Sequence, residues 1–294
     1  MKTTPPCLSH RLIIALDMMS PVQALALAQT LCGLGVTFKV GMELFYRGGM
    51  ALAREIAALQ ARPRGVFIDL KLHDIPNTAG MAAQALASQG VDFFNVHALG
   101  GEAMMRAAVE GARHGHQIRA AVEGARHGHQ IRAAVEGARQ GRQMRAAAES
   151  ARQVDQTRPA TDPAQDNAPP LLLGVTLLTS LDAQTLARDL KIDLALESMV
   201  VHLAQLAQRA GLGGVVCSAQ EAASLRAACG ADFQLVTPGI RPAFEARVDD
   251  QARICTPAQA LRNGADYLVV GRPVTQAADP AHSVARILEE MAAA

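Results

Sequence analysis

Short apolar and β-branched runs recur along the chain, and Ala/Leu-rich segments with helically spaced apolar residues lie between them. The runs have the length and composition of buried parallel strands. Eight such runs occur, at residues 12–16, 37–40, 66–70, 93–96, 171–175, 214–216, 233–236 and 267–270. Helical segments between them include residues 21–31, 51–59, 79–87, 221–228 and 283–291.

This alternation is typical of βα units that surround a parallel sheet. Eight such units in 294 residues predict a single α/β domain, a (β/α)8 TIM barrel that covers residues 1–294. A doubly wound open sheet is the structural alternative. That fold often carries a GxGxxG motif after its first strand, and none follows residues 12–16.

One region, residues 106–170, interrupts the pattern between the fourth and fifth strands. The unit RAAVEGARHGHQI begins at Arg106, recurs identically from Arg119 and then decays in copies from Arg132 and Arg145, before a Pro/Asp-rich linker. A 13-residue step advances a helix by about 3.6 turns, so successive copies do not return to one face. We therefore expect an inserted duplication on the barrel face opposite the active site. Its glycines predict a frayed helical protrusion, because each costs a helix about 1 kcal/mol; they are Gly111, Gly115, Gly124, Gly128, Gly137 and Gly141.

Composition limits the classes of partner. The formal net charge is +1, so no global basic field attracts nucleic acid or an anionic membrane, and any phosphate recognition must be local. Neither a signal peptide nor a membrane-spanning run is present, which predicts a cytoplasmic protein. The five cysteines are scattered without metal-ligand spacing and are expected to be reduced thiols.

Polar residues follow nearly all of the predicted strands, where TIM barrels place their active sites. The densest group is VFIDLKLHDIPNT, residues 66–78, which contains Asp69, Lys71 and Asp74. Asp69 and Lys71 are two positions apart, so a regular strand would point both side chains to one face. Clustered charges at a partly buried mouth indicate a reactive site, although a solvated ion-pair loop is the alternative reading.

The loops after the seventh and eighth strands carry PGIR, ending at Arg241, and GRP, around Arg272. TIM barrels commonly bind phosphate at these loops, and the arginine fork matches phosphate oxygens. These segments predict the phosphate site. His97, at the end of the fourth strand, is interpreted as a hydrogen-bonded structural residue. The repeat histidines lack carboxylate or thiolate partners at metal-ligand spacing, so no metal site is expected; they are His114, His116, His127 and His129.

The segment DLKLHDIPNT closely resembles the signature of the orotidine 5′-phosphate decarboxylases, and further segments match bacterial members in order along the chain. These segments are IIALD, FKVGMELF, NVHALGG, LLTS, GVVCSAQE, LVTPGIRP and VVGRPVTQ. Together they run from about residue 12 to residue 288, omitting the repeat and linker. The resemblance implies a cofactor-free decarboxylase of pyrimidine biosynthesis that converts orotidine 5′-phosphate to UMP and CO2.

The resemblance also implies roles for individual residues. Lys71 would protonate the ring carbon within a charge network completed by Lys39, Asp69 and Asp74. The residues implied to bind substrate are Asp17, Thr78, Thr179, Ser180, Arg241, Gln251, Gly271 and Arg272. Asp74 and Thr78 would act across the interface of a homodimer, as in the family.

Two other functions remain open from the residues alone. A metal-dependent sugar-phosphate lyase or decarboxylase of the same superfamily would share the D-x-K-x-x-D pattern. The segments IPNT, LLTS and PGIRP favour the nucleotide enzyme over it. A catalytically silent nucleotide-phosphate binder is the second alternative, and the intact set of Asp and Lys residues argues against it.

Overall fold

Eight parallel strands form a closed barrel in the computed structural model, which describes residues 8–59, 65–139, 169–245 and 255–294. The strands pair in sequence order, and β1 closes the ring by pairing with β8, with Leu12 opposite Leu268. They are β1 (Leu12–Ala15), β2 (Thr37–Gly41), β3 (Val66–Leu72), β4 (Phe93–His97), β5 (Leu171–Val175), β6 (Gly214–Val216), β7 (Gln234–Thr237) and β8 (Tyr267–Val270). The predicted (β/α)8 barrel is therefore confirmed.

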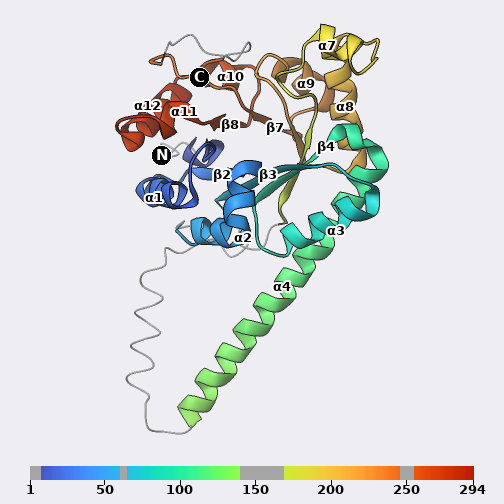
Figure 1. Ribbon diagram of the computed structural model, residues 1–294. Helices are drawn as coiled ribbons and strands as arrows, with labels where there is room; N and C mark the ends of the chain where they lie inside the picture. The colour runs from blue at the N-terminus through green and yellow to red at the C-terminus, as the bar shows by residue number, and fades with distance from the viewer. Residues whose placement is uncertain (1–7, 60–64, 140–168, 246–254) are drawn as a thin grey trace, which may run out of the picture.

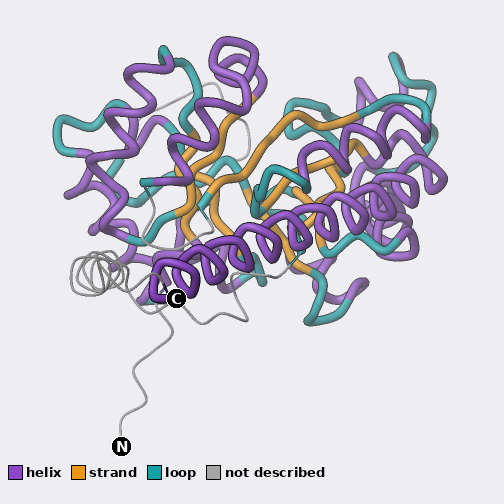
Figure 2. The backbone as a smooth tube through the Cα atoms, turned by 90° about the horizontal axis from the view of Figure 1, so that it is seen from below, coloured by secondary structure: helices purple, strands orange, loops and turns teal. Residues whose placement is uncertain are grey.

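Helices surround the strands, as Figures 1 and 2 show. The α-helices are α1 (Pro21–Leu31), α2 (Met42–Ala58), α3 (Pro76–Ala87), α4 (Gly101–Arg139), α7 (Ala183–Arg188), α8 (Leu196–Ala210), α9 (Ala222–Cys229), α10 (Pro257–Arg262), α11 (Arg272–Thr275) and α12 (Pro280–Ala292). Short 3-10 turns are η1 (Leu8–Arg11), η2 (Cys32–Leu34) and η3 (Ala98–Gly100). Among the described helices, none combines the length and apolar character needed to cross a bilayer.

The strand residues divide between two apolar layers. Leu12, Ile14 and Leu16 point outward into a core shared with the helices. Ile13 and Ala15 point inward, where they pack with a smaller cluster that fills the barrel. Because successive strand side chains face opposite sides, an uninterrupted apolar run supplies both layers at once.

Helix α1 begins at the residue that the sequence predicted, because local capping groups define its start. Ser20 accepts a hydrogen bond from the backbone of Gln23, whose side chain accepts one from the Ser20 backbone in return. This capping box, with Pro21 at the first helical position, begins the helix at the predicted residue. α3 begins three residues earlier than the apolar spacing indicated, because its first residues, 76–78, are exposed. α2 begins at Met42, and the predicted segment 51–59 lies beyond Gly49, whose φ of +59° interrupts this helix.

The repeat was expected to form a frayed helical protrusion, but its first copy is packed. Its first copy, residues 106–118, belongs to α4, and Ala108, Val109 and Ala112 are buried there. A Cβ on Gly111 would collide with the carbonyl of Gly80 in α3, so this glycine lets the two helices approach closely. The expectation was wrong for this copy, because glycines that weaken an isolated helix serve a tight helix contact here.

Beyond the first copy, α4 continues as one helix to Arg139 and projects away from the barrel (Figure 1). The later part of the repeat and the linker, residues 140–168, lie outside the described residues. The predicted protrusion is thus helical as far as the chain is described.

Candidate active site

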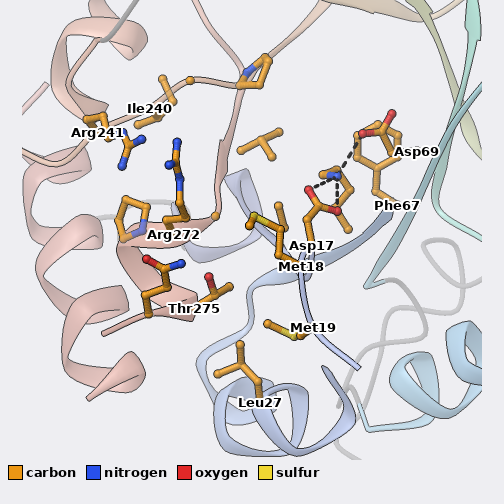
Figure 3. Close-up of a pocket in the computed structure, with 18 of the residues that line it drawn as sticks. Asp17, Met18, Met19, Leu27, Phe67, Asp69, Ile240, Arg241, Arg272 and Thr275 are labelled. Atoms are coloured by element: carbon orange, nitrogen blue, oxygen red, sulfur yellow. Dashed lines mark hydrogen bonds and ion pairs between the residues drawn. The ribbon is translucent and has the colours of Figure 1, made fainter. Parts of the chain in front are cut away.

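A cavity of about 760 Å³ opens at the carboxyl-terminal ends of the barrel strands. Residues of β1, β2, β3, β6 and β8 line it, together with the loops that follow β1, β5, β7 and β8. Figure 3 shows this cavity with its charged side chains in two separate groups. The carboxyl ends of the strands are where TIM barrels hold their active sites.

The first group is a chain of charges of alternating sign. The Nζ atom of Lys39 lies 2.9 Å from Asp17 Oδ2 and 3.1 Å from Asp69 Oδ2. The Nζ atom of Lys71 lies 2.7 Å from Asp69 Oδ1. The Lys39 side chain is only 8% exposed, whereas those of Lys71 and Asp17 are 30% and 47% exposed. The network therefore has a buried centre and two ends that face the cavity.

Lys71 lies at a break in the pleat of β3. Its φ of +51° is left-handed, and the pairing of β3 with β4 shifts between Ile68 and Leu72. The Lys71 N–H donates to Asn95 Oδ1 at 2.7 Å, and Asn95 Nδ2 donates to Asp69 Oδ1 at 2.7 Å. Asp69 and Lys71 meet at the mouth as predicted, but a bulge braced by Asn95 brings them together instead of a regular pleat.

The network keeps its inner members ionised. Burial raises the pKa of Asp69, but the charges of Lys39 and Lys71 outweigh it and lower that pKa from 3.8 to about 2. Burial likewise lowers the pKa of Lys39, yet attraction to Asp69 and Asp17 gives a net rise. At neutral pH the centre of the network is therefore a carboxylate beside an ammonium group.

The second group lies across the cavity and is cationic. The side chains of Arg241 and Arg272 line the cavity and are well separated from Asp17 and Asp69 (Figure 3). Gly239 precedes Arg241 by two positions with φ +77°, which allows the sharp turn after β7. Gly271 lines the cavity just before Arg272 and α11. Two guanidinium groups beside glycine backbone suit a dianionic phosphate.

Comparisons with known proteins agree with this geometry. Residues 10–287 match the model of the "Orotidine 5'-phosphate decarboxylase / HUMPS family". The chain belongs to this family. It is 41% identical over 285 residues to the orotidine 5′-phosphate decarboxylase of Heliobacterium modesticaldum, covering 96% of each chain. It is 43% identical to that of Syntrophotalea carbinolica, covering 97% of this chain and 96% of the other.

The solved structures include the crystal structure of orotidine 5′-phosphate decarboxylase from Lactobacillus acidophilus. The TM-score is 0.69 at 32% identity, over 95% of this chain and 98% of that one. The similarity therefore covers the whole barrel and is not confined to the signature segment.

Most of the residues predicted from the family resemblance line one cavity. They are Asp17, Lys39, Asp69, Lys71, Thr179, Arg241, Gly271 and Arg272. Ser180 is exposed beside Thr179 without lining the cavity, and Gln251 lies outside the described residues. Asp74 and Thr78 are exposed away from the cavity, and Asp74 Oδ1 accepts the Ile75 N–H at 2.7 Å.

Two contributors were missed from the sequence. Asn95 braces the bulge, and its position two residues before His97 on a predicted strand was the available signal. Gly41 ends β2, where a Cβ would collide with Asp17 Oδ1 and lie 3.2 Å from Lys39 Nζ. A glycine at the end of a strand beside an active site indicates a close approach of this kind.

His97 lies beside the network, and its Nδ1 atom accepts a hydrogen bond from the Leu99 N–H at 3.4 Å. It stacks on His73 with ring centroids 5.3 Å apart. Burial lowers the pKa of His97, and the nearby His73 and Lys71 lower it further. A neutral, hydrogen-bonded ring fits the structural role expected for His97.

Proposed function

We propose that this chain decarboxylates orotidine 5′-phosphate to UMP and CO2, a step of pyrimidine biosynthesis, with Lys71 as the proton donor. The observation that carries the proposal is the placing of the Asp17–Lys39–Asp69–Lys71 network and the two arginines in one cavity. A substrate with its phosphate at Arg241 and Arg272 can extend its base toward Lys71. Family membership and relatives named as this decarboxylase support the same substrate.

The chemistry follows from the charges. When the bond from the ring carbon to the carboxylate breaks, CO2 leaves and the electron pair stays on that carbon. The ammonium of Lys71 stabilises the developing negative charge and then transfers a proton to the carbon, leaving a neutral amine that regains a proton from water. Asp69 orients the Lys71 ammonium through the 2.7 Å contact, and Lys39 balances the charge of Asp69 from the other side. The proposal requires no cofactor.

The test is loss of pyrimidine absorbance when purified protein is incubated with orotidine 5′-phosphate, with and without EDTA. Turnover that survives EDTA supports the proposal. Turnover that EDTA abolishes favours the metal-dependent sugar-phosphate branch of the superfamily, which the named relatives do not favour. Tight UMP binding without turnover would identify the catalytically silent binder.

We further propose a homodimer in which Asp74 and Thr78 reach the neighbouring subunit's site. Both are exposed on this chain, next to exposed apolar side chains that a second copy would cover. Ile75 is 66% exposed and Met81 is 59% exposed on the same segment. Large apolar side chains that gather on one surface mark an interface.

Mixing inactive Asp74→Ala subunits with inactive Lys71→Ala subunits tests the shared site. Each hybrid dimer would contain one site with both native residues, so activity should return as subunits exchange. Exchange demonstrated without recovered activity would contradict a role for Asp74 across the interface.

We place the enzyme in the cytoplasm. The support is its cysteine chemistry, because Cys32, Cys217, Cys229 and Cys255 are free thiols, as expected in a reducing compartment. Fractionation of cells that express the protein, with a compartment marker as control, tests the placement.

A further inference from the structure

The chain just after Arg241 rests on α12, the last helix. The backbone N–H of Ala243 donates to Glu290 Oε2 at 3.1 Å. The guanidinium carbon of Arg286 stands 3.9 Å from the centre of the Phe244 ring, a cation–π contact. Arg286 and Glu290 are four residues apart, so they occupy one face of α12. Two different interactions thus join consecutive residues of this segment to the same helical face.

Arg241 is held from its other side as well. Its backbone N–H donates to the carbonyl of Cys255 at 2.9 Å, and Ile240 pairs with Cys255 in a parallel bridge. Pro242 follows immediately and is buried, which fixes one more backbone dihedral. The backbone that carries the Arg241 side chain is therefore fixed between Cys255 and α12.

The same helix also holds the second arginine. Ser283 of α12 is buried, and its Oγ donates to the carbonyl of Pro273 at 2.7 Å. Pro273 directly follows Arg272 in α11, which lies beside α12 (Figure 1). Residues 283, 286 and 290 are spaced by three and four, so all three contacts come from one stripe of α12.

We propose that α12 is the frame that sets the separation of Arg241 and Arg272, with Ser283, Arg286 and Glu290 as positioning residues for phosphate binding. None of the three lines the cavity; each acts through the backbone or ring of a residue beside an arginine. Two arginines fixed at one separation can bind phosphate without ordering their backbones at the moment of binding. The inference rests on the proposed function only for the identity of the substrate, because Arg241 and Arg272 held at one separation would bind the phosphate of any nucleotide.

A purely structural role for these contacts predicts a different result. Loose packing of α12 would weaken the whole barrel and affect every ligand alike. A positioning role affects the ligands that carry a phosphate and spares those that lack it. The matched pair of UMP and uridine separates the two roles, because they differ only in the phosphate.

The central variant is Arg286→Ala, an exposed position whose loss leaves no buried cavity. Calorimetry with UMP should show affinity reduced about fivefold, the equivalent of one exposed cation–π contact, while uridine binding stays within error. Combining it with Glu290→Ala, which removes the acceptor of the Ala243 N–H, should increase the loss for UMP alone. The kcat/KM for orotidine 5′-phosphate should fall in parallel, with that for orotidine unchanged.

Two control variants make the result specific. Arg286→Lys keeps a cation over Phe244 and should recover most of the UMP affinity. Glu289→Ala removes an exposed charge from α12 one residue before Glu290 and should change neither ligand's affinity.

Unchanged UMP affinity in Arg286→Ala with Glu290→Ala would overturn the inference, and so would equal losses for UMP and uridine. The proposed function fails separately. Wild-type protein that binds UMP with this dependence on α12 but turns over no orotidine 5′-phosphate would contradict the decarboxylase and leave the inference standing.

Discussion

The two ends of the barrel use charged side chains in opposite ways. At the amino-terminal end, Arg226 donates to the carbonyls of Gly230, Ala231, Phe233 and Gly264 and to Asp266 Oδ2, at distances of 2.6–2.9 Å. Asp266 in turn accepts the Leu235 N–H at 2.7 Å, just inside β7. The charged groups of Arg226 and Asp266 therefore bond to backbone groups and to each other, and in this way they join loops and strand ends.

At the mouth, the charged side chains bond mainly to each other. Asp17, Lys39, Asp69 and Lys71 form a line in that order, and its only amide partner among the described residues is Asn95. The ends of the line remain partly exposed to the cavity. Charged side chains whose hydrogen bonds go to backbone groups stabilise the closed end of the barrel. Charged side chains that pair with each other at the mouth leave Asp17 and Lys71 oriented toward a substrate. Substitutions at the two ends should therefore separate activity from stability.

The largest effect is expected for Lys71→Ala at the mouth. Removal of the proton donor and of its charge should lower kcat by at least about a thousandfold. The free energy of unfolding should change by less than about 1 kcal/mol, because a partly exposed ion pair contributes little. Steady-state kinetics and urea unfolding measure the two effects, with Lys191→Ala, an exposed lysine outside the cavity, as control. Activity within tenfold of wild type would contradict the role of Lys71.

Asp266→Ala at the opposite end should show the reverse. It leaves the Leu235 N–H and one Arg226 donor without their partner, which should lower the free energy of unfolding by about 3 kcal/mol. Folded protein should keep kcat/KM within about twofold, because the barrel mouth is untouched. Urea unfolding together with kinetics below the transition checks this. A selective loss of kcat with unchanged stability would contradict the view that charged residues at this end serve stability and those at the mouth serve activity.

Arg272→Ala tests the cationic side of the mouth. Loss of one guanidinium contact to phosphate should lower kcat/KM for orotidine 5′-phosphate by about thirtyfold, roughly 2 kcal/mol. The nucleoside orotidine should be a poor substrate of both wild type and variant, to a similar degree. If wild type and variant handle nucleotide and nucleoside alike, the phosphate binds elsewhere.

The smallest effect is expected for the excision of residues 119–144, two whole repeat units. Arg145 then takes the place of Arg119, whose guanidinium lies against Gly90, and α4 keeps its packed first copy. Activity should remain within about twofold and Tm within about 2 °C, since length in such connections has a small entropic cost. A large loss of either would show that the projecting part of α4 supports the barrel or the dimer.

A glycine pair within the repeat provides the matched comparison. Gly111→Ala should destabilise the protein, because its Cβ would meet the Gly80 carbonyl. Gly124→Ala has nothing within 4 Å and should be neutral or stabilising by up to about 1 kcal/mol. Thermal melts of the two variants distinguish the packed copy from the projecting one.

The sequence by itself determined the elements and the chemical groups of this protein. All eight strands occur within about two residues of their predicted bounds, because apolar runs and capping residues such as Ser20 act locally. The DLKLHDIPNT segment likewise predicted Asp69 and Lys71 at the mouth, since strand ends converge in a closed barrel.

Only the tertiary structure decided how those groups are held. The Asn95 brace, the contact of Gly111 with Gly80 and the contact of Ala243 with Glu290, 47 residues apart, arise only when the barrel closes. No local sequence pattern predicts such contacts. A glycine in a repeat or a glutamate on a helix has the same helix propensity whether or not a distant partner contacts it. Closure of the ring gave the repeat glycine its packing role and placed α12 against the segments that carry both phosphate-side arginines.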